Sequence, residues 1–313
     1  MRTALVLRAL GLGDLLTGVP ALRGLRRGLP GHRIVLAAPR VLEPLVRLSG
    51  TVDEVLHVPD LGPLPDAGPV DIAVDLHGNG PASHDPLLDA EPRRLMAFDV
   101  PGGPRWDPGE HEVPRWCRLL AWYGIPSDPS ELDLPAPDRP SPAPDAVVVH
   151  PGAAYPSRRW PPERFAAVAA ALRRRGERVV VTGGPDETGI ARRVAAAAGL
   201  PPEDDLSGRT DLLDLAALVA SARLVVSGDT GTGHLATAYR TPSVLLFGPT
   251  PPKLWGPPPD RPEHRVLWKG GRGDPHGMRP DPALLRIGPD EVVAAAADHL
   301  SRLEGVTSWN APL

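Results

Sequence analysis

Short apolar runs alternate with segments of helical periodicity along most of the chain. Residues 4–7 form a continuous apolar run, typical of a strand buried on both faces, and a glycine turn with helically spaced leucines follows. Further strands are expected at residues 34–37, 55–58, 72–75, 146–149, 179–182, 224–226 and 244–247. Further helices are expected at residues 41–48, 162–174, 187–198, 211–221, 233–238 and 290–303. Strands that alternate with helices predict parallel sheets of the α/β class.

A proline-rich stretch at residues 134–145 interrupts this alternation. Closely spaced prolines favour an extended and stiff connection, so this stretch is the best linker candidate in the chain. We therefore predict a first lobe over residues 1–133 and a second lobe, with a terminal helix, over residues 146–313. The length of 313 residues agrees with about two domains. A ligand cleft is expected between two such lobes.

Composition excludes several classes of protein. The formal net charge is −4, which argues against a nucleic-acid binder, because such proteins carry a clear basic excess. Cys117 is the single cysteine, so the chain cannot form an internal disulfide, and its apolar neighbours indicate a core position. No apolar stretch approaches the roughly 18–20 residues of a transmembrane helix. We expect a cytoplasmic protein, with peripheral contact to a membrane surface left open.

Neither a cofactor nor a metal is indicated. The dinucleotide fingerprint G-x-G-x-x-G would need a third glycine where Leu16 stands, and an acidic residue where Arg40 follows the second strand. The zinc motif H-E-x-x-H does not occur, and the ten histidines are scattered. We expect no cofactor and no metal site.

The strongest local signal lies at residues 227–236, where an apolar strand runs through a glycine-rich turn into a helix. Glycines allow the backbone to approach a ligand closely, and the first N–H groups of a helix form a site suited to phosphate. Thr230 and Thr232 add hydroxyl groups, and His234 adds a ring N–H donor. The same pattern also fits a plain strand-to-helix turn in which Asp229 only caps the helix.

Two more segments follow predicted strands and carry charged groups. Arg158 and Arg159 come after the strand at 146–149. A guanidinium group pairs bidentately with phosphate oxygens, although a solvated arginine pair is the simpler alternative. Asp14 lies just beyond the first strand, where a helix begins. A carboxylate there either caps its helix or faces the ligand edge of the sheet and accepts a proton from a substrate hydroxyl.

Five blocks, in their order along the chain, resemble glycosyltransferase family 9, which is typified by ADP-heptose:lipopolysaccharide heptosyltransferases. They are Arg8 and Leu12-Gly13-Asp14 with Pro20-Ala21-Leu22, His150-Pro151-Gly152 with Arg159-Trp160-Pro161, Thr182-Gly183-Gly184-Pro185 with Glu187, Gly228-Asp229-Thr230-Gly231 with His234-Leu235-Ala236, and Phe247-Gly248-Pro249-Thr250 with Trp255-Gly256-Pro257. The resemblance covers nearly the whole chain and is loosest in the acceptor lobe.

The resemblance implies a GT-B architecture, in which two Rossmann-like lobes with parallel sheets face a central cleft. It implies an inverting, metal-independent glycosyltransferase that moves a heptose or hexose from a nucleoside-diphosphate sugar, with ADP-heptose as the expected donor. The implied acceptor is a hydroxyl group of a glycan, glycolipid or metabolite, as in biosynthesis of the lipopolysaccharide core. Because the arginine-rich and alanine-rich composition agrees with a GC-rich genome, the acceptor need not be lipopolysaccharide.

The resemblance also implies roles for particular residues. Asp14 is the implied general base that activates the acceptor hydroxyl. The implied diphosphate-binding residues are Arg158, Thr230, Gly231, Thr232, Gly233 and His234, and those for the nucleotide and sugar are Glu187 and Asp229. On the acceptor side the implied residues are His77 and Asn79. Arg158 stands where the family commonly has lysine.

Two other functions are compatible with the same residues. A nucleotide-sugar epimerase or hydrolase of this architecture would act on the donor without an acceptor. A catalytically silent protein would bind the nucleotide sugar without turnover, and its binding would persist after Asp14→Ala.

Overall fold

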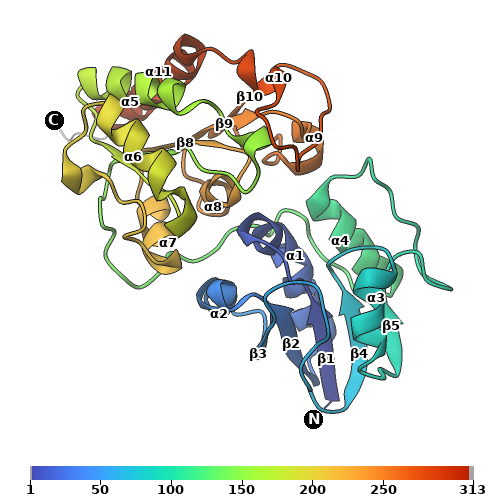
Figure 1. Cartoon of the computed structure of the whole chain (residues 1–313). Helices are drawn as coiled ribbons and strands as arrows, with labels where there is room; N and C mark the ends of the chain where they lie inside the picture. Colours follow the sequence, from blue (N-terminus) through green and yellow to red (C-terminus); the bar gives the residue numbers. More distant parts are fainter. Residues whose placement is uncertain (1, 310–313) are drawn as a thin grey trace. The chain divides into compact units, whose positions relative to one another are not determined.

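The computed structural model describes residues 2–309 of the chain. The chain divides after Pro135 into two compact units, each with its own parallel sheet (Figure 1). This boundary falls inside the proline-rich stretch at 134–145. Beyond it, Arg139 of the second unit pairs with Asp211 and Asp214 at N–O distances of 2.8 and 2.7 Å. The predicted α/β class with two parallel-sheet lobes is confirmed.

The first unit contains a five-stranded parallel sheet in the order β3-β2-β1-β4-β5. Its strands are β1 (Arg2–Leu7), β2 (His32–Ala38), β3 (Glu54–His57), β4 (Val70–Asp75) and β5 (Arg94–Met96). Its helices are α1 (Leu12–Gly28), α2 (Glu43–Ser49), α3 (Pro81–Leu88) and α4 (Glu112–Trp122). The central strand β1 is buried from its second residue onward, as its apolar run predicts.

The core of the first unit is built on both faces of β1. Leu5 and Leu7 pack in one cluster with Leu87 of α3 and with apolar residues of the loop that follows β3. Helices α1 and α4 pack against each other. Cys117 of α4 is buried as predicted, and burial raises the pKa of its thiol to about 12, which makes it a core residue rather than a nucleophile.

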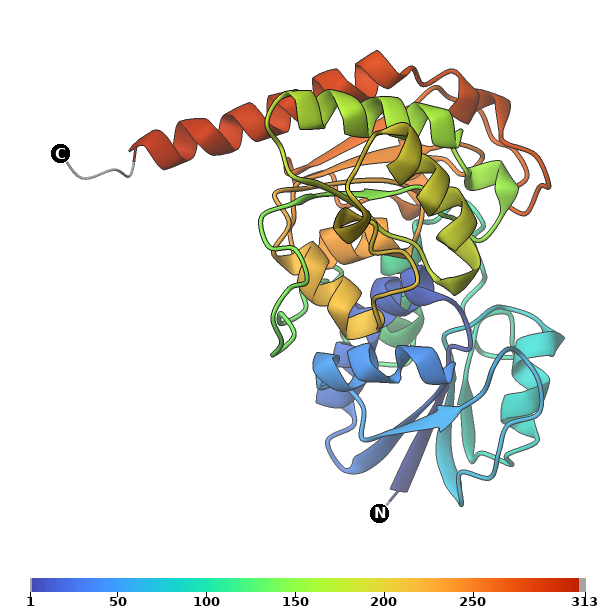
Figure 2. The ribbon, with the colours of Figure 1, turned by 60° about the vertical axis from the view of Figure 1, so that its left-hand side comes forward.

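The second unit contains a five-stranded parallel sheet in the order β10-β9-β8-β6-β7. Its strands are β6 (Val147–His150), β7 (Val179–Val181), β8 (Leu224–Gly228), β9 (Ser243–Phe247) and β10 (His264–Trp268). Its helices are α5 (Pro162–Arg174), α6 (Thr188–Ala197), α7 (Leu212–Ala220), α8 (Gly231–Ala238), α9 (Pro252–Trp255), α10 (Pro282–Leu285) and α11 (Pro289–Trp309). Helix α5 lies alongside α11, and both contribute apolar side chains to the core over β6 and β8 (Figure 2).

All eight predicted strands are present, with small differences at their ends. The edge strands β5 and β10 were missed, because they carry polar or exposed residues such as Arg94, Arg265 and Trp268 and therefore lack the apolar run of a central strand. Helix α3 was also missed, because its two prolines obscure a helical pattern.

Both sheets reverse their strand order next to their first strand, between β1 and β4 in the first unit and between β6 and β8 in the second. In an open parallel sheet, ligands bind beyond the carboxyl ends of the strands at such a reversal. There Leu7 pairs with Asp75, and His150 pairs with Ser227. Apart from Glu187, which follows β7, the predicted site residues therefore follow the strands that form these two reversal points.

Candidate functional site

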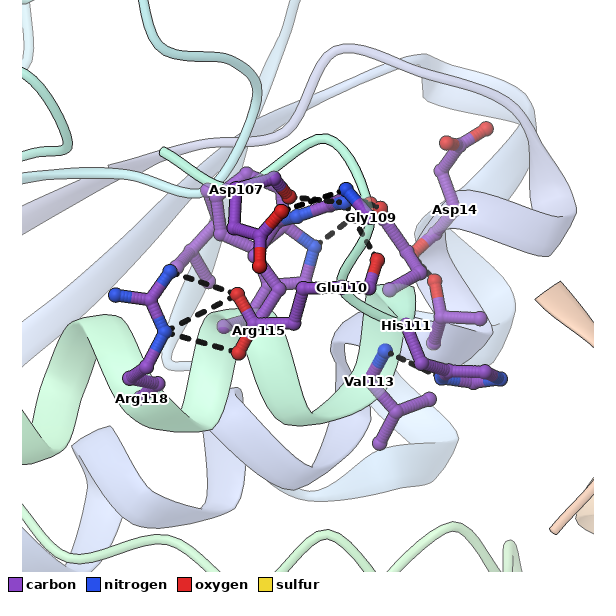
Figure 3. A network of polar contacts seen from close by, with 12 residues as sticks. Asp14, Asp107, Gly109, Glu110, His111, Val113, Arg115 and Arg118 are labelled. Atoms are coloured by element: carbon purple, nitrogen blue, oxygen red, sulfur yellow. Dashed lines mark hydrogen bonds and ion pairs between the residues drawn. The ribbon is translucent and has the colours of Figure 1, made fainter. Parts of the chain in front are cut away.

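Asp14 lies at the reversal point of the first unit, in the first turn of α1. One of its carboxylate oxygens accepts the backbone N–H of Gly11 at 3.2 Å, and its main-chain oxygen accepts Nε of Arg8 at 2.5 Å. Asp14 thus supports the start of its own helix, which was the simpler of the two predicted roles. Figure 3 shows its carboxyl group pointing away from the labelled side chains of α4.

The surroundings of Asp14 favour its neutral form. Burial raises the pKa of the Asp14 carboxyl group, and the positive charge of Arg8 partly counteracts this rise. The negative charge of Glu112 raises this pKa further, and the hydrogen bond from Gly11 lowers it. A carboxylate made more basic in this way is suited to accept a proton from a hydroxyl group near neutral pH.

His77 and Asn79, the residues predicted for an acceptor, lie in the loop after β4. Asp75 organises this loop, because one of its oxygens accepts the N–H groups of His77 and Gly78 at 2.8 and 3.1 Å. Burial lowers the pKa of His77, so its ring is neutral at physiological pH. Asn79 is exposed and donates to Asp99 at 3.1 Å. Both residues therefore lie at the carboxyl edge of the sheet, as Asp14 does. The positive charge of Arg8 also lowers the pKa of His77.

In the second unit, the predicted glycine turn runs from β8 into α8. Thr230 is the residue that precedes the first turn of α8, and its side chain makes no capping hydrogen bond. Its hydroxyl oxygen is buried without a hydrogen-bond partner among the described residues. Thr232 and Gly233 are buried in the first turn, and Asp229 is buried just before it. The Thr230 side chain therefore does not use the backbone N–H groups at the start of α8, and these groups can bind an anion.

Arg158 lies directly beside this turn. Its main-chain oxygen would be 3.2 Å from a Cβ atom at Gly228, so a larger residue there would push the two loops slightly apart. The guanidinium group lies 5.7 Å from the ring of Tyr155. In the part of the chain that the structure describes, Nε of Arg158 is buried without a hydrogen-bond partner. A buried donor without a partner is unfavourable unless a ligand completes it, and an anion at the start of α8 would do so.

A pocket opens at the same turn. It is lined by Gly228, Asp229, Thr230, Gly233, His234, Thr237, Leu245, Phe247, Trp255 and Pro257. The rings of His234 and Trp255 meet edge to face, with centroids 6.0 Å apart. The pocket therefore combines a polar floor at the start of α8 with an apolar wall from β9 and α9, as small-molecule sites commonly do.

Glu187 lies on the other side of β6, over the loop that follows that strand. Its carboxylate accepts the N–H of Gly184 at 2.8 Å and lies 3.6 Å from Nε2 of His150. Burial lowers the pKa of His150, while the charge of Glu187 opposes that effect. The other ring nitrogen of His150 bonds the hydroxyl of Thr182 at 3.0 Å. A half-buried carboxylate held by such contacts can accept hydrogen bonds from ribose hydroxyls.

The contact between Glu187 and Gly152 predicts a stability effect. A Cβ atom at residue 152 would lie 2.1 Å from Oε1 of Glu187, and the carboxylate can move away only by giving up its hydrogen bond from Gly184. Gly152→Ala should therefore lower the free energy of unfolding by about 1 kcal/mol. Gly189, in α6, has nothing within 4 Å of such an atom, so Gly189→Ala should be neutral or stabilising. Urea unfolding of both variants checks this, and equal stability of the two would contradict the predicted clash.

Two buried charged residues lie beside Asp14, and no site role was predicted for either of them, although Arg8 belongs to the first block of the family resemblance. Arg8 is 1% exposed and Glu112 is 4% exposed, and their side chains lie 3.3 Å apart. The sequence contains one indication of a role for Arg8, because it is a charged residue directly after an apolar strand. It contains no such indication for Glu112, which lies among polar residues.

The described residues contain neither a group of side chains that could hold a metal ion nor a helix that could span a membrane. Between residues 2 and 309, no group of three or more histidine, cysteine, aspartate or glutamate side chains is arranged to hold a metal ion. Over the same residues, none of the helices combines the length and apolar character needed to cross a bilayer.

Comparison with known proteins identifies heptosyltransferases among the relatives of this chain. The family model for glycosyltransferase family 9 (heptosyltransferase) matches residues 104–272. Lipopolysaccharide heptosyltransferase 3 of Escherichia coli is 36% identical over 113 residues, which is 36% of this chain and 33% of that protein. The aligned segment therefore spans about a third of the length of this curated relative.

Solved structures match almost the whole chain. The structure of a family 9 glycosyl transferase from Veillonella parvula superimposes with a TM-score of 0.77 at 21% identity, covering 96% of this chain and 97% of that one. The ADP-heptose lipopolysaccharide heptosyltransferase II of E. coli gives the same TM-score and identity, covering 96% and 99%. Together with the two parallel-sheet lobes, these neighbours confirm the predicted GT-B fold class.

Proposed function

The chain belongs to glycosyltransferase family 9, the heptosyltransferase family, and we propose that it is an inverting glycosyltransferase that needs no resident metal ion. Its donor is a nucleoside-diphosphate heptose or hexose, with ADP-heptose as the first candidate. Its acceptor is a hydroxyl group of a glycan, glycolipid or metabolite. The observation that carries this proposal is the start of α8, where no side chain caps the first amides and the main chain of Arg158 lies beside Gly228. Among the described residues, the Thr230 hydroxyl and Nε of Arg158 are buried without a hydrogen-bond partner.

The second unit supplies the groups that a departing diphosphate needs. When the bond between the anomeric carbon and the diphosphate oxygen breaks, the electron pair leaves with the nucleoside diphosphate. The helix start at Gly231 and the charge of Arg158 would stabilise that negative charge, because both are fixed before the reaction begins. Glu187 would bind the nucleotide at its ribose, and the pocket between His234 and Trp255 would hold the sugar end.

The first unit supplies the base. Asp14 would take the proton of the acceptor hydroxyl while its oxygen forms the new bond to the anomeric carbon, on the face opposite the diphosphate. The configuration at that carbon is therefore inverted, and the products are the glycosylated acceptor and the nucleoside diphosphate. The raised pKa of Asp14 suits this step, since a more basic carboxylate binds the transferred proton more tightly.

We expect acceptor-dependent release of ADP from ADP-heptose by the purified chain. Release is measured with a set of hydroxyl acceptors and without any acceptor, and the thermal shift with ADP, UDP and GDP identifies the base, because a ligand of the native state raises its apparent stability. Release that is unchanged by every acceptor would instead indicate an epimerase or hydrolase. Binding of the nucleotide sugar without any turnover would indicate a silent binding protein.

A further inference from the structure

Arg8 connects the elements that meet around Asp14. Its Nε donates to the main-chain oxygen of Asp14 at 2.5 Å, and one terminal nitrogen donates to the carbonyl of Leu76, just after β4. The other terminal nitrogen lies 3.0 Å from Oγ1 of Thr17 and 3.3 Å from Oε1 of Glu112. The hydroxyl of Thr17 also donates to the Asp14 carbonyl at 3.0 Å. A single guanidinium group therefore ties the first turn of α1 to β4 and α4.

The helix face of α1 leaves room for this arrangement only because residue 18 is a glycine. A Cβ atom at Gly18 would lie 2.8 Å from Nε and 3.0 Å from Cδ of Arg8. These atoms are held by hydrogen bonds on a fully buried side chain, so they cannot move aside easily.

Glu112 is shared between two arginines. Besides Arg8, it pairs with Arg115, and its Oε1 accepts Nε1 of Trp116 at 2.8 Å. Arg115 is buried too, and its second terminal nitrogen donates to the carbonyls of Asp107 and Glu110 at 3.1 and 2.6 Å (Figure 3). The cluster of Arg8, Glu112 and Arg115 thus carries two positive charges and one negative charge in a buried place.

The remaining positive charge lies next to Asp14. Burial of the Asp14 carboxyl group raises its pKa, the charge of Arg8 partly lowers it, and the charge of Glu112 raises it again. The other charged groups near the cluster are already engaged. Glu110 pairs with Arg118 at 2.7 Å, and Asp75 binds backbone N–H groups and Ser83.

A histidine side chain is neutral or positive, so the two histidines near the cluster cannot offset its positive charge. His77 is kept neutral by burial and by the charge of Arg8, as its lowered pKa shows. His111, which precedes α4, uses its Nδ1 to accept the N–H of Val113 at 3.1 Å. The charges that act on Asp14 are therefore those of Arg8 and Glu112.

We propose that Arg8 and Glu112 are positioning residues for Asp14: Arg8 fixes the main chain of Asp14, and Glu112 holds Arg8 in place and offsets its charge. The inference rests on the proposed function, in which Asp14 is the base. It assigns a role to Glu112, which lies 104 positions from Arg8 in the sequence and contacts Asp14 only through Arg8.

The test compares Glu112→Gln with Glu110→Gln. Glutamine at 112 keeps an oxygen for Arg8 and Trp116 but removes the charge, so the titration midpoint of Asp14 should fall by about one pH unit. Glu110→Gln removes a carboxylate from the same segment that pairs with Arg118 instead, so the midpoint should stay unchanged. The midpoint is read by NMR of ¹³C-carboxyl-labelled aspartate in the full chain, with Asp14→Asn identifying the signal. The acidic limb of kcat/KM for transfer should move with it, at unchanged donor KM.

Arg8→Lys separates two effects of Arg8, the hydrogen bonds that hold the main chain of Asp14 and the positive charge beside its carboxyl group. Lysine keeps the positive charge but cannot reach the four partners of the guanidinium group, so kcat should fall about tenfold with little movement of the midpoint. This variant also keeps the inference testable if Glu112→Gln does not fold.

Two results would overturn the inference: equal midpoints in the two glutamine variants, or full kcat in Arg8→Lys. Because the NMR midpoint needs no turnover, it distinguishes this failure from a failure of the proposed function. If the parent chain transfers no sugar at any pH, the proposed function is lost, and the midpoints still decide how Arg8 and Glu112 act on Asp14.

Discussion

Asp14→Asn is expected to lower kcat for sugar transfer by about 10²–10⁴-fold, the range in which general bases contribute. Asparagine keeps the size of the side chain and can still accept the N–H of Gly11, but it cannot take the proton of the acceptor hydroxyl. Because the groups proposed for the nucleotide sugar belong to the second unit, its affinity should stay within a few-fold. Steady-state kinetics and a donor titration measure both quantities.

The stability of the same variant provides the control. The pKa of Asp14 is raised in the folded chain, so the contribution of this group to stability is full below its unfolded value of about 4 and is lost as the pH rises through the folded value. Asparagine does not ionise, so Asp14→Asn should melt at a higher temperature than the parent at neutral pH. This difference should shrink as the pH falls below about 4. Lost transfer with a higher melting temperature cannot be ascribed to unfolding, whereas full transfer would remove Asp14 from the mechanism.

Arg158→Ala is expected to weaken the binding of ADP by roughly 10- to 100-fold, since a hydrogen bond to a charged group contributes about 1.5–3 kcal/mol. Binding of adenosine should change much less, because Nε of Arg158 is buried without a partner among the described residues and the main chain of Arg158 adjoins the turn before α8, where the diphosphate is proposed to lie. Isothermal titration with both ligands separates the contribution of the phosphates from that of the nucleoside.

Arg159→Ala is the matched control for this prediction. Nε of Arg159 already donates to the carbonyl of Ala153 at 2.8 Å. Loss of this side chain should therefore disturb the loop after β6 and change the affinities for ADP and adenosine by the same factor. If Arg158→Ala also reduced ADP and adenosine binding equally, Arg158 would not contact the diphosphate.

Much of the fold could be predicted from the sequence, because its signals are local. The central strands β1, β6 and β8 are apolar runs, and α5 and α7 begin at Pro162 and after Asp211 as proline and capping preferences indicate. The edge strands β5 and β10 could not be predicted in this way, because only pairing with β4 and β9 makes Arg94–Met96 and His264–Trp268 extended.

The candidate site divides in the same manner. The position of Asp14 after β1 and the glycine turn after β8 could be predicted, because each follows from a strand end and a helix start. The packing of Glu187 on Gly152 and the pocket wall at Trp255 could not, since they join segments that are distant in the sequence.

The sequence by itself determined the α/β class, the central strands and helices, and which residues stand at the carboxyl ends of β1, β6 and β8. Periodicity, glycine content and capping act over a few residues, so a single chain displays them directly. Only the tertiary structure decided that Arg8 is buried, that Glu112 is its carboxylate partner and that Arg158 lies beside Gly228. Burial and ion pairing depend on which remote segments the sheet topology brings together, and no local pattern contains that information.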